Sequence, residues 1–244
     1  MNEFQIASFS VASSEKQNFD AIANAILPRN RLLLVIADGV GSSLHGGDAA
    51  RLAVATCVEM ASSAEISDVF IEANIRISAA ANSDYKQWST TLTTCILDGG
   101  NAYVGHVGDT RIYHLRGAGI QTRTKDQTEA EKLIDEGVLS RERARRYPRK
   151  NVLLSALNGS GEYELQQSSF EIMDGDRILL LSDGLYKQVG KHEIVQLSVD
   201  NVDVAAFIDA LKVMLTDRGV IDDSSVICAE LRENHFNATG DVAV

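Results

Sequence analysis

The chain has 244 residues, of which 45% are hydrophobic, and this is enough for one domain with a well-buried core. Its formal net charge of -11 argues against a nucleic-acid-binding protein, since such proteins present basic surface. The first residues lack the basic start and apolar core of a signal peptide, and no apolar run approaches the length of a membrane span. We therefore expect a cytoplasmic protein that neither spans a membrane nor binds nucleic acid.

The cysteines indicate the same compartment. Cys57, Cys95 and Cys228 are odd in number, widely spaced and each inside an apolar segment. This pattern favours buried free thiols in a reducing cytosol over disulfides.

Apolar patterning predicts strands and helices in alternating groups. Strands are expected near residues 4–12, 31–37, 89–97, 102–107, 111–116, 163–170, 177–182 and 224–231. Helices are expected near residues 48–62, 66–80, 127–136 and 204–215. Short turns between consecutive strands make the sheets mostly antiparallel. Residues 1–233 are expected to form one domain, and residues 234–244, which have no periodicity, a loose tail.

Two of the most apolar runs end at an aspartate followed by a glycine. They are residues 32–37 before Asp38-Gly39 and residues 178–182 before Asp183-Gly184. Such a run is typical of a strand buried on both faces, so each carboxylate is expected at the rim of a rigid core. Asp-Gly is also a common hairpin turn, and we interpret the further copies at Asp98-Gly99 and Asp174-Gly175 as ordinary turns.

Other aspartates stand at the ends of predicted strands. They are Asp20, Asp109 and the pair Asp222-Asp223. With no histidine or cysteine in comparable positions, the set offers oxygen ligands only, and hard cations such as Mg²⁺ and Mn²⁺ prefer such ligands. Each aspartate alone is typical of an ordinary surface residue, so the prediction of a metal site depends on the whole set.

One basic stretch interrupts this acidic chain. Residues 141–150 read Arg-Glu-Arg-Ala-Arg-Arg-Tyr-Pro-Arg-Lys. A solvated helix face or loop is the usual meaning of such a run, and a patch for an anionic substrate or acidic partner is the alternative. The sequence leaves both open.

In order and spacing, these segments resemble the metal-dependent protein serine/threonine phosphatases, the PPM family or type 2C. Seven motifs carry the resemblance, at residues 18–20, 38–46, 103–111, 124–128, 151–157, 182–185 and 222–226. Any single motif is weak, but seven in family order, covering about residues 5–232, are specific. The resemblance implies an α+β fold of α/β/β/α layers, with two antiparallel sheets packed as a sandwich and flanked by helices on both sides.

The resemblance also implies a cleft that holds two Mn²⁺ or Mg²⁺ ions. Asp38 would bridge the two ions, and the Gly39 carbonyl would join one of them. Asp183 and Asp222 would hold the other ion, and Asp20 would act directly or through a water. Asp38, Asp183 and Asp222 are thus the expected catalytic residues. The implied reaction is hydrolysis of phosphoserine and phosphothreonine in proteins by a hydroxide shared between the two ions.

Two further residues are expected to meet the substrate. Glu15 occupies the place where many members of the family carry a phosphate-binding arginine, and the adjacent Lys16 is a candidate to replace it. His45 is a candidate proton donor to the leaving oxygen. The expected partners are a phosphorylated protein and a cognate serine/threonine kinase.

Other departures from the family pattern concern the metals. Phe19 replaces the usual Glu or Gln, and Asp223 replaces an Asn. Asp109 keeps one ligand of the third cation that the family often binds, but Lys187 stands where another carboxylate is expected. We therefore expect two occupied metal sites, with Lys187 either paired with Asp109 or pointing into solvent. The alternative function is a catalytically weak relative that binds a phosphoprotein or kinase as a regulator.

Overall fold

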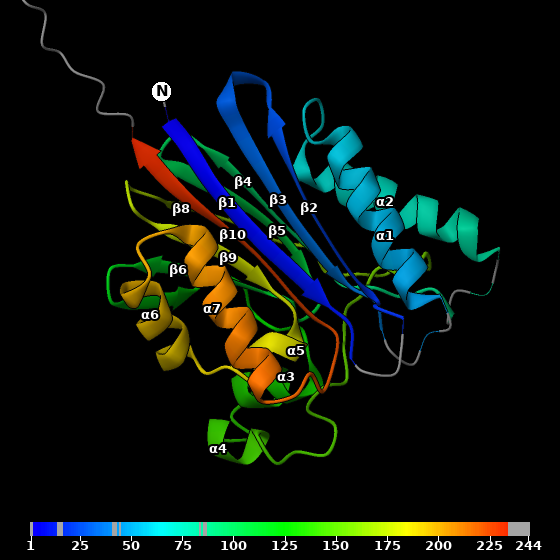
Figure 1. Cartoon of the computed structure of the whole chain (residues 1–244). Coiled ribbons are helices and arrows are strands. Elements are labelled where there is room, and N and C mark those ends of the chain that lie inside the picture. The colour runs from blue at the N-terminus through cyan, green and yellow to red at the C-terminus, as the bar shows by residue number, and fades with distance from the viewer. Residues whose placement is uncertain are drawn as a thin grey trace, which may run out of the picture.

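Two antiparallel sheets packed face to face form the centre of the molecule (Figure 1). This computed structural model describes residues 2–13, 17–40, 43, 45–82, 84 and 87–233. The first sheet contains, in spatial order, β1 (Asn2–Val11), β10 (Ser224–Glu233), β9 (Arg177–Leu181), β6 (Arg111–Arg116) and β7 (Gly119–Thr122). The second contains β2 (Asp20–Leu27), β3 (Arg31–Asp38), β4 (Leu92–Asp98), β5 (Asn101–Val107) and β8 (Gln166–Glu171).

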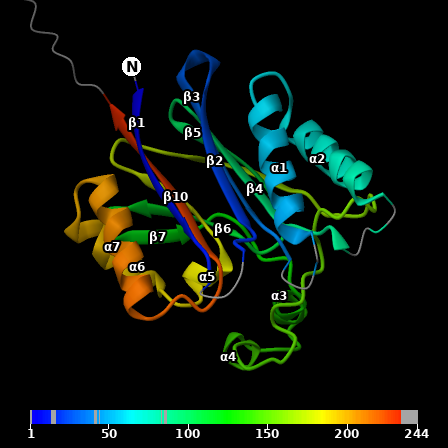
Figure 2. The ribbon, with the colours of Figure 1, turned by 45° about the vertical axis from the view of Figure 1, so that its right-hand side comes forward.

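Helices cover the outer face of each sheet (Figures 1 and 2). The helices are α1 (Gly46–Met60), α2 (Ile66–Ala81), α3 (Glu129–Asp135), α4 (Arg141–Ala144), α5 (Asp183–Tyr186), α6 (Lys191–Asp200) and α7 (Val204–Asp217), with a 3-10 turn, η1 (Pro28–Asn30). The pair α1 and α2 packs on the second sheet, and α6 and α7 pack on the first. The expected four-layer α+β sandwich is confirmed.

Strand β3 shows why the apolar runs lack the usual alternation of apolar and polar residues. Its Leu34 and Ile36 pack in the core between the two sheets. Its Leu33 and Val35 point the other way, into the core beneath α1, where the small side chain of Ala49 allows close approach. Each fully buried aliphatic side chain contributes roughly 1.5–3 kcal/mol of burial free energy, so this strand is held firmly on both faces.

The expected helices correspond to α1, α2, α3 and α7, whereas β2, β7 and α4 to α6 were not expected as separate elements. Strand β2 lies at the edge of its sheet and is rich in alanine. It contains few of the β-branched and aromatic residues that indicate strands. The predicted tail at residues 234–244 lies outside the described residues. The three cysteines are free and buried, as expected. None of the helices in the described ranges is long and apolar enough to cross a membrane.

Antiparallel pairing brings the ends of several strands together at one end of the sandwich. Asp20 and Asp38 are direct partners in the register of β2 and β3. Strand β9 ends next to the start of β10, and the start of β6 pairs with the same end of β9. The residues just beyond these ends therefore meet, although they are far apart in the sequence.

Candidate metal centre

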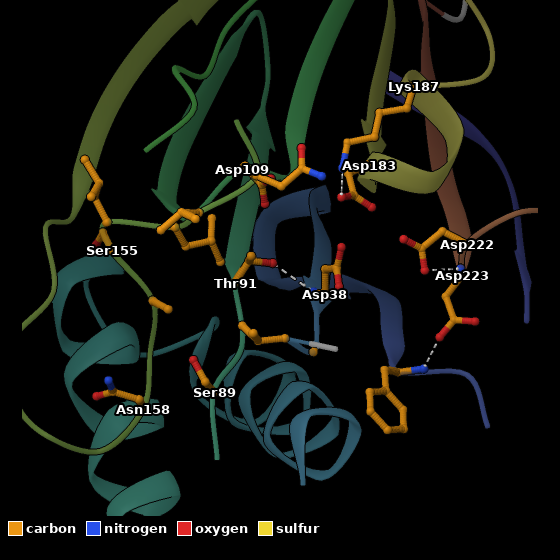
Figure 3. A pocket seen from close by; sticks show the side chains of 18 of the residues that line it. Asp38, Ser89, Thr91, Asp109, Ser155, Asn158, Asp183, Lys187, Asp222 and Asp223 are labelled. Carbon is orange, nitrogen blue, oxygen red and sulfur yellow. Dashed lines mark hydrogen bonds and ion pairs between the residues drawn. The ribbon is translucent and has the colours of Figure 1, made fainter. Parts of the chain in front are cut away.

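Asp38 is held by its backbone at the end of β3 (Figure 3). Its N–H donates to Thr91 Oγ1 at 2.8 Å, and its carbonyl accepts from the Thr91 N–H at 2.9 Å. The Thr90 hydroxyl donates to the same carbonyl at 3.0 Å. Both backbone groups of Asp38 are thus fixed by one neighbouring segment, which leaves the carboxylate to face the cleft.

The glycines after Asp38 and Asp183 are required by close packing. A Cβ on Gly39 would lie 2.3 Å from the carbonyl carbon of Gly46, where the strand end crosses the first turn of α1. A Cβ on Gly184 would lie 2.1 Å from the Asp223 carbonyl oxygen. By contrast, Gly99 and Gly175 have φ of 58° and 78° and open space around them, as hairpin turns require. The interpretation of Asp98-Gly99 and Asp174-Gly175 as ordinary turns is therefore confirmed.

Asp20 is buried and lies opposite Asp38 in the pairing of β2 and β3. Its Oδ2 accepts a hydrogen bond from the Ser182 hydroxyl at 2.7 Å, and that hydroxyl accepts from the Ser225 N–H at 2.9 Å. Its Oδ1 is buried and has no hydrogen-bond partner among the described residues. Burial, with smaller contributions from the charges of Asp183 and Asp223, raises the pKa of Asp20 to about 7.

Asp109 stands between β5 and β6 and is only 6% exposed. Burial, helped by the charges of Asp183 and Asp126, raises the pKa of Asp109 to about 7. The Tyr186 hydroxyl donates to the Asp109 carbonyl at 3.1 Å. Arg111 stacks on the Tyr186 ring at 3.6 Å and is held by both oxygens of Asp126 at 2.9 and 2.6 Å. These contacts fix the backbone that presents Asp109.

Lys187 departs from its expected position. Its ammonium pairs with the carboxylate of Asp183, one turn earlier in α5, rather than with Asp109 or with solvent alone (Figure 3). The expected pairing with Asp109 is therefore wrong, because the helical i,i+4 spacing brings Asp183 closer. The charge of Lys187 still lowers the pKa of Asp109 and of Asp222, against the larger effect of burial.

The neighbouring carboxylates of Asp222 and Asp223, just before β10, have different surroundings. Burial, then the charge of Asp183, raises the pKa of Asp222. The Asp223 carboxylate accepts backbone N–H groups of Ser13 at 2.9 Å and Phe19 at 2.7 Å. Asp223 thus ties the end of β1 and the approach to β2 to the start of β10. No spacing in the sequence signals a contact of this kind.

An open cleft of about 930 Å³ unites these groups. Asp38, Asp109, Asp183 and Asp222 line it together with Gly39, and the segment of residues 151–156 forms one wall. Burial raises the pKa of Asp38 well above its usual range, and the charges of Asp20, Asp183, Asp109 and Asp222 raise it further. Burial and mutual repulsion therefore oppose ionisation of these carboxyl groups when no cation is bound.

The donor set of the cleft fits a hard divalent cation. The candidate ligands are oxygen atoms only, and one buried oxygen of Asp20 has no partner among the residues that the structure describes. A cation would also relieve the repulsion among the carboxylates. Over the described ranges, no three acidic, histidine or cysteine side chains form a ready-made ligand set for one ion. Backbone carbonyls and water would therefore have to complete the coordination.

Of the two expected substrate-binding residues, only His45 belongs to the part of the chain that the structure describes. His45 does not line the cleft; its Nδ1 lies 3.2 Å from Asp48 Oδ2, and its ring stacks on Trp88 with 4.9 Å between centroids. Glu15 and Lys16 lie outside the described residues. The roles of His45 and Lys16 stay predictions.

Known proteins similar to this chain are phosphatases. Over 216 residues, the chain is 28% identical to the serine/threonine protein phosphatase PstP of Mycobacterium tuberculosis, a match that covers 85% of this chain and 42% of the relative. The chain thus spans less than half the length of that relative. It is also 28% identical to the serine/threonine phosphatase stp of Listeria monocytogenes over 214 residues, covering 82% of this chain and 85% of the relative.

Solved structures agree with these sequence matches. A crystal structure of the Mycobacterium tuberculosis phosphatase PstP/Ppp aligns with a TM-score of 0.83 at 28% identity, covering 94% of this chain and 99% of the other. The catalytic domain of PstP in complex with two manganese ions aligns with a TM-score of 0.79 at 27% identity, covering 96% and 100%. Residues 10–223 match the family model described as protein phosphatase 2C, and the chain therefore belongs to this family.

Proposed function

We propose that the protein hydrolyses phosphoserine and phosphothreonine esters in proteins and that it needs Mn²⁺ or Mg²⁺ to do so. The observation that carries the proposal is one cleft in which Asp38, Asp109, Asp183 and Asp222 converge. Next to Asp38 in the strand pairing, Asp20 has a buried oxygen with no hydrogen-bond partner in the described part of the chain. Family membership and the phosphatase relatives support the same reaction class.

The proposed ligands of two ions are Asp20, Asp38, the Gly39 carbonyl, Asp183 and Asp222, with Asp109 beside them. When bound, such ions would make a hydroxide nucleophile available near neutral pH and would offset the charge on the phosphoryl oxygens. The proposed two-ion arrangement is supported by the solved relative that holds two manganese ions.

The protein's own contribution is to hold several carboxyl groups close together in fixed positions. Their raised pKa values mean that the metal-free cleft retains protons near neutral pH, so metal binding must release them. Thr91 and Thr90 fix the backbone of Asp38, and Tyr186 fixes that of Asp109, so that charge repulsion does not splay the strand ends apart. A site held in this way loses little energy to rearrangement when it binds its ligand.

A second candidate is a phosphoprotein-binding regulator with weak turnover. The ion pair between Lys187 and Asp183 favours it, because the ammonium occupies a carboxylate that a cation would use. The proposed partners under either function are a phosphoprotein and a cognate serine/threonine kinase, in the cytoplasm. Lys16 is proposed to contact the phosphate.

Phosphate release from a phosphothreonine peptide in Mn²⁺ and in EDTA tests the proposal. We expect turnover in Mn²⁺ and none in EDTA, with the Asp38→Asn variant as an inactive control. Tight peptide binding in Mn²⁺ without phosphate release would instead support the regulator. Full activity in EDTA would exclude the metal-dependent reaction.

A further inference from the structure

The basic segment of residues 141–150 projects from the end of the sandwich that carries the cleft. It consists of α4 and the turn that follows, and Figure 1 shows α4 beside α3, outside both sheets. Its exposed cations are Arg141, Arg143, Arg145, Arg146, Arg149 and Lys150. We call these six side chains the basic face. In a chain of net charge -11, this face is a local reversal of sign.

Part of the basic face lacks partners within the protein. Arg149 pairs with Glu129 at 2.6 Å, and Arg141 approaches Glu131 at 3.4 Å. Over the described ranges, the guanidinium groups of Arg143, Arg145 and Arg146 make no hydrogen bond or ion pair. These three arginines are therefore available to an outside ligand. In a network of ion pairs with a purely structural role, they would be paired with carboxylates of the protein.

The scaffold under the basic face is fixed. Ser140 caps α4 by accepting the Arg143 N–H at 3.3 Å, and Ala144 is buried beneath it. The Tyr147 hydroxyl donates to Glu129, and Lys150 Nζ donates to the Arg145 carbonyl at 3.1 Å. The backbone is thus ordered before binding, which lowers the entropic cost of a contact to the arginines.

In the chain, the segment that carries the basic face is followed directly by the wall of the cleft. Lys150 is followed by Asn151, the first of the consecutive residues 151–156 that form the cleft wall. The exposed cations of this adjoining face attract carboxylates of a substrate. A phosphorylated residue in the cleft would thus have its neighbours in sequence beside the basic face.

We propose that the basic face binds acidic residues that flank the phosphorylated residue, so that the enzyme prefers phosphoserine and phosphothreonine in acidic segments of proteins. This rests on the proposed phosphatase function. The contacts are exposed ion pairs, so they contribute to substrate binding and leave the chemical step unchanged. They also weaken as salt rises.

The test compares Arg145→Gln/Arg146→Gln with Arg29→Gln/Lys212→Gln, which removes the same charge from exposed sites away from the basic face. Substrates are a phosphothreonine peptide with acidic flanks, the same peptide with alanine flanks, and p-nitrophenyl phosphate, all with Mn²⁺. Losing two exposed pairs of ordinary strength should raise KM for the acidic peptide roughly fivefold, with kcat unchanged. KM for the other two substrates should not move, and the control variant should match the wild type.

A wild type that does not distinguish acidic from alanine flanks would overturn the proposal, as would equal KM values in the two double variants. If neither phosphothreonine peptide is hydrolysed in Mn²⁺, the phosphatase function has failed instead. Fluorescence anisotropy of the two labelled peptides then still decides about the basic face. Tighter binding of the acidic peptide by the wild type than by Arg145→Gln/Arg146→Gln supports it, and equal binding refutes it.

Discussion

Replacing Asp109 with asparagine should stabilise the metal-free protein, and the gain should grow with pH. The carboxyl is 6% exposed, and burial with the charges of Asp183 and Asp126 raises its pKa from 3.8 to about 7. Because the folded-state pKa lies above that of the unfolded chain, the folded protein binds the proton more tightly. The resulting stability is full below about pH 4 and is lost as the pH rises through about 7.

The size of the effect follows from these two pKa values. Between pH 5 and pH 8, the linkage relation gives a loss of about 2.5 kcal/mol for a carboxyl whose pKa rises from 3.8 to about 7 on folding. Asparagine has a similar shape and no charge, so the Asp109→Asn variant escapes this loss. The difference in unfolding free energy between variant and wild type should therefore widen by about 2.5 kcal/mol over this range.

Urea unfolding in EDTA at pH 5 and pH 8 measures this difference, with the fluorescence of the single tryptophan, Trp88, as the signal. Asp98→Asn is the matched control, since Asp98 is exposed at the turn between β4 and β5. Added Mn²⁺ at pH 8 should narrow the difference, because a bound cation relieves the same repulsion. A difference that stays constant between the two pH values, or that the control shares, would refute the reasoning.

Three further substitutions test other parts of the site. Asp38→Asn should lower turnover at saturating Mn²⁺ by several orders of magnitude while the circular dichroism stays that of the wild type, and near wild-type turnover would mean that Asp38 is misassigned. Lys187→Asp should add a third Mn²⁺ site to two in the wild type, counted by calorimetry; three sites in the wild type would contradict the idea that Lys187 replaces a ligand. Gly39→Ala should lower the unfolding free energy by roughly 3 kcal/mol or more, because its Cβ would lie 2.3 Å from the carbonyl carbon of Gly46. Gly99→Ala, in open space at φ of 58°, should cost roughly 1–2 kcal/mol, and equal losses would mean that the close approach at Gly39 is not what selects glycine.

Apolar patterning predicted central strands buried on both faces, whereas the arrangement of the sheets as a sandwich came from the family resemblance. Leu32 to Ala37 form an unbroken apolar run, and the structure divides that run between the two cores. The position of Asp38 follows from the end of the run. Strand β2 escaped prediction because it is an alanine-rich edge strand whose place depends on pairing with β3.

The missed contacts in the site are of two kinds. The pairing of Lys187 with Asp183 could have been predicted from the sequence. The two residues have i,i+4 spacing, and a short helix after β9 brings such residues together. The Asp223 carboxylate binds backbone groups of Ser13 and Phe19 about 200 residues away, and no local pattern encodes that. Long-range hydrogen bonds of this kind appear only once the sheets have assembled.

A manganese anomalous difference map from crystals grown with MnCl₂ tests the central claim most directly, namely that the acidic cleft is a metal centre. We predict two strong peaks in the cleft, both within coordination distance of Asp38, one of them also bound by Asp183 and Asp222. A map without peaks at Asp38, or with Mn²⁺ bound only outside the cleft, would contradict the account.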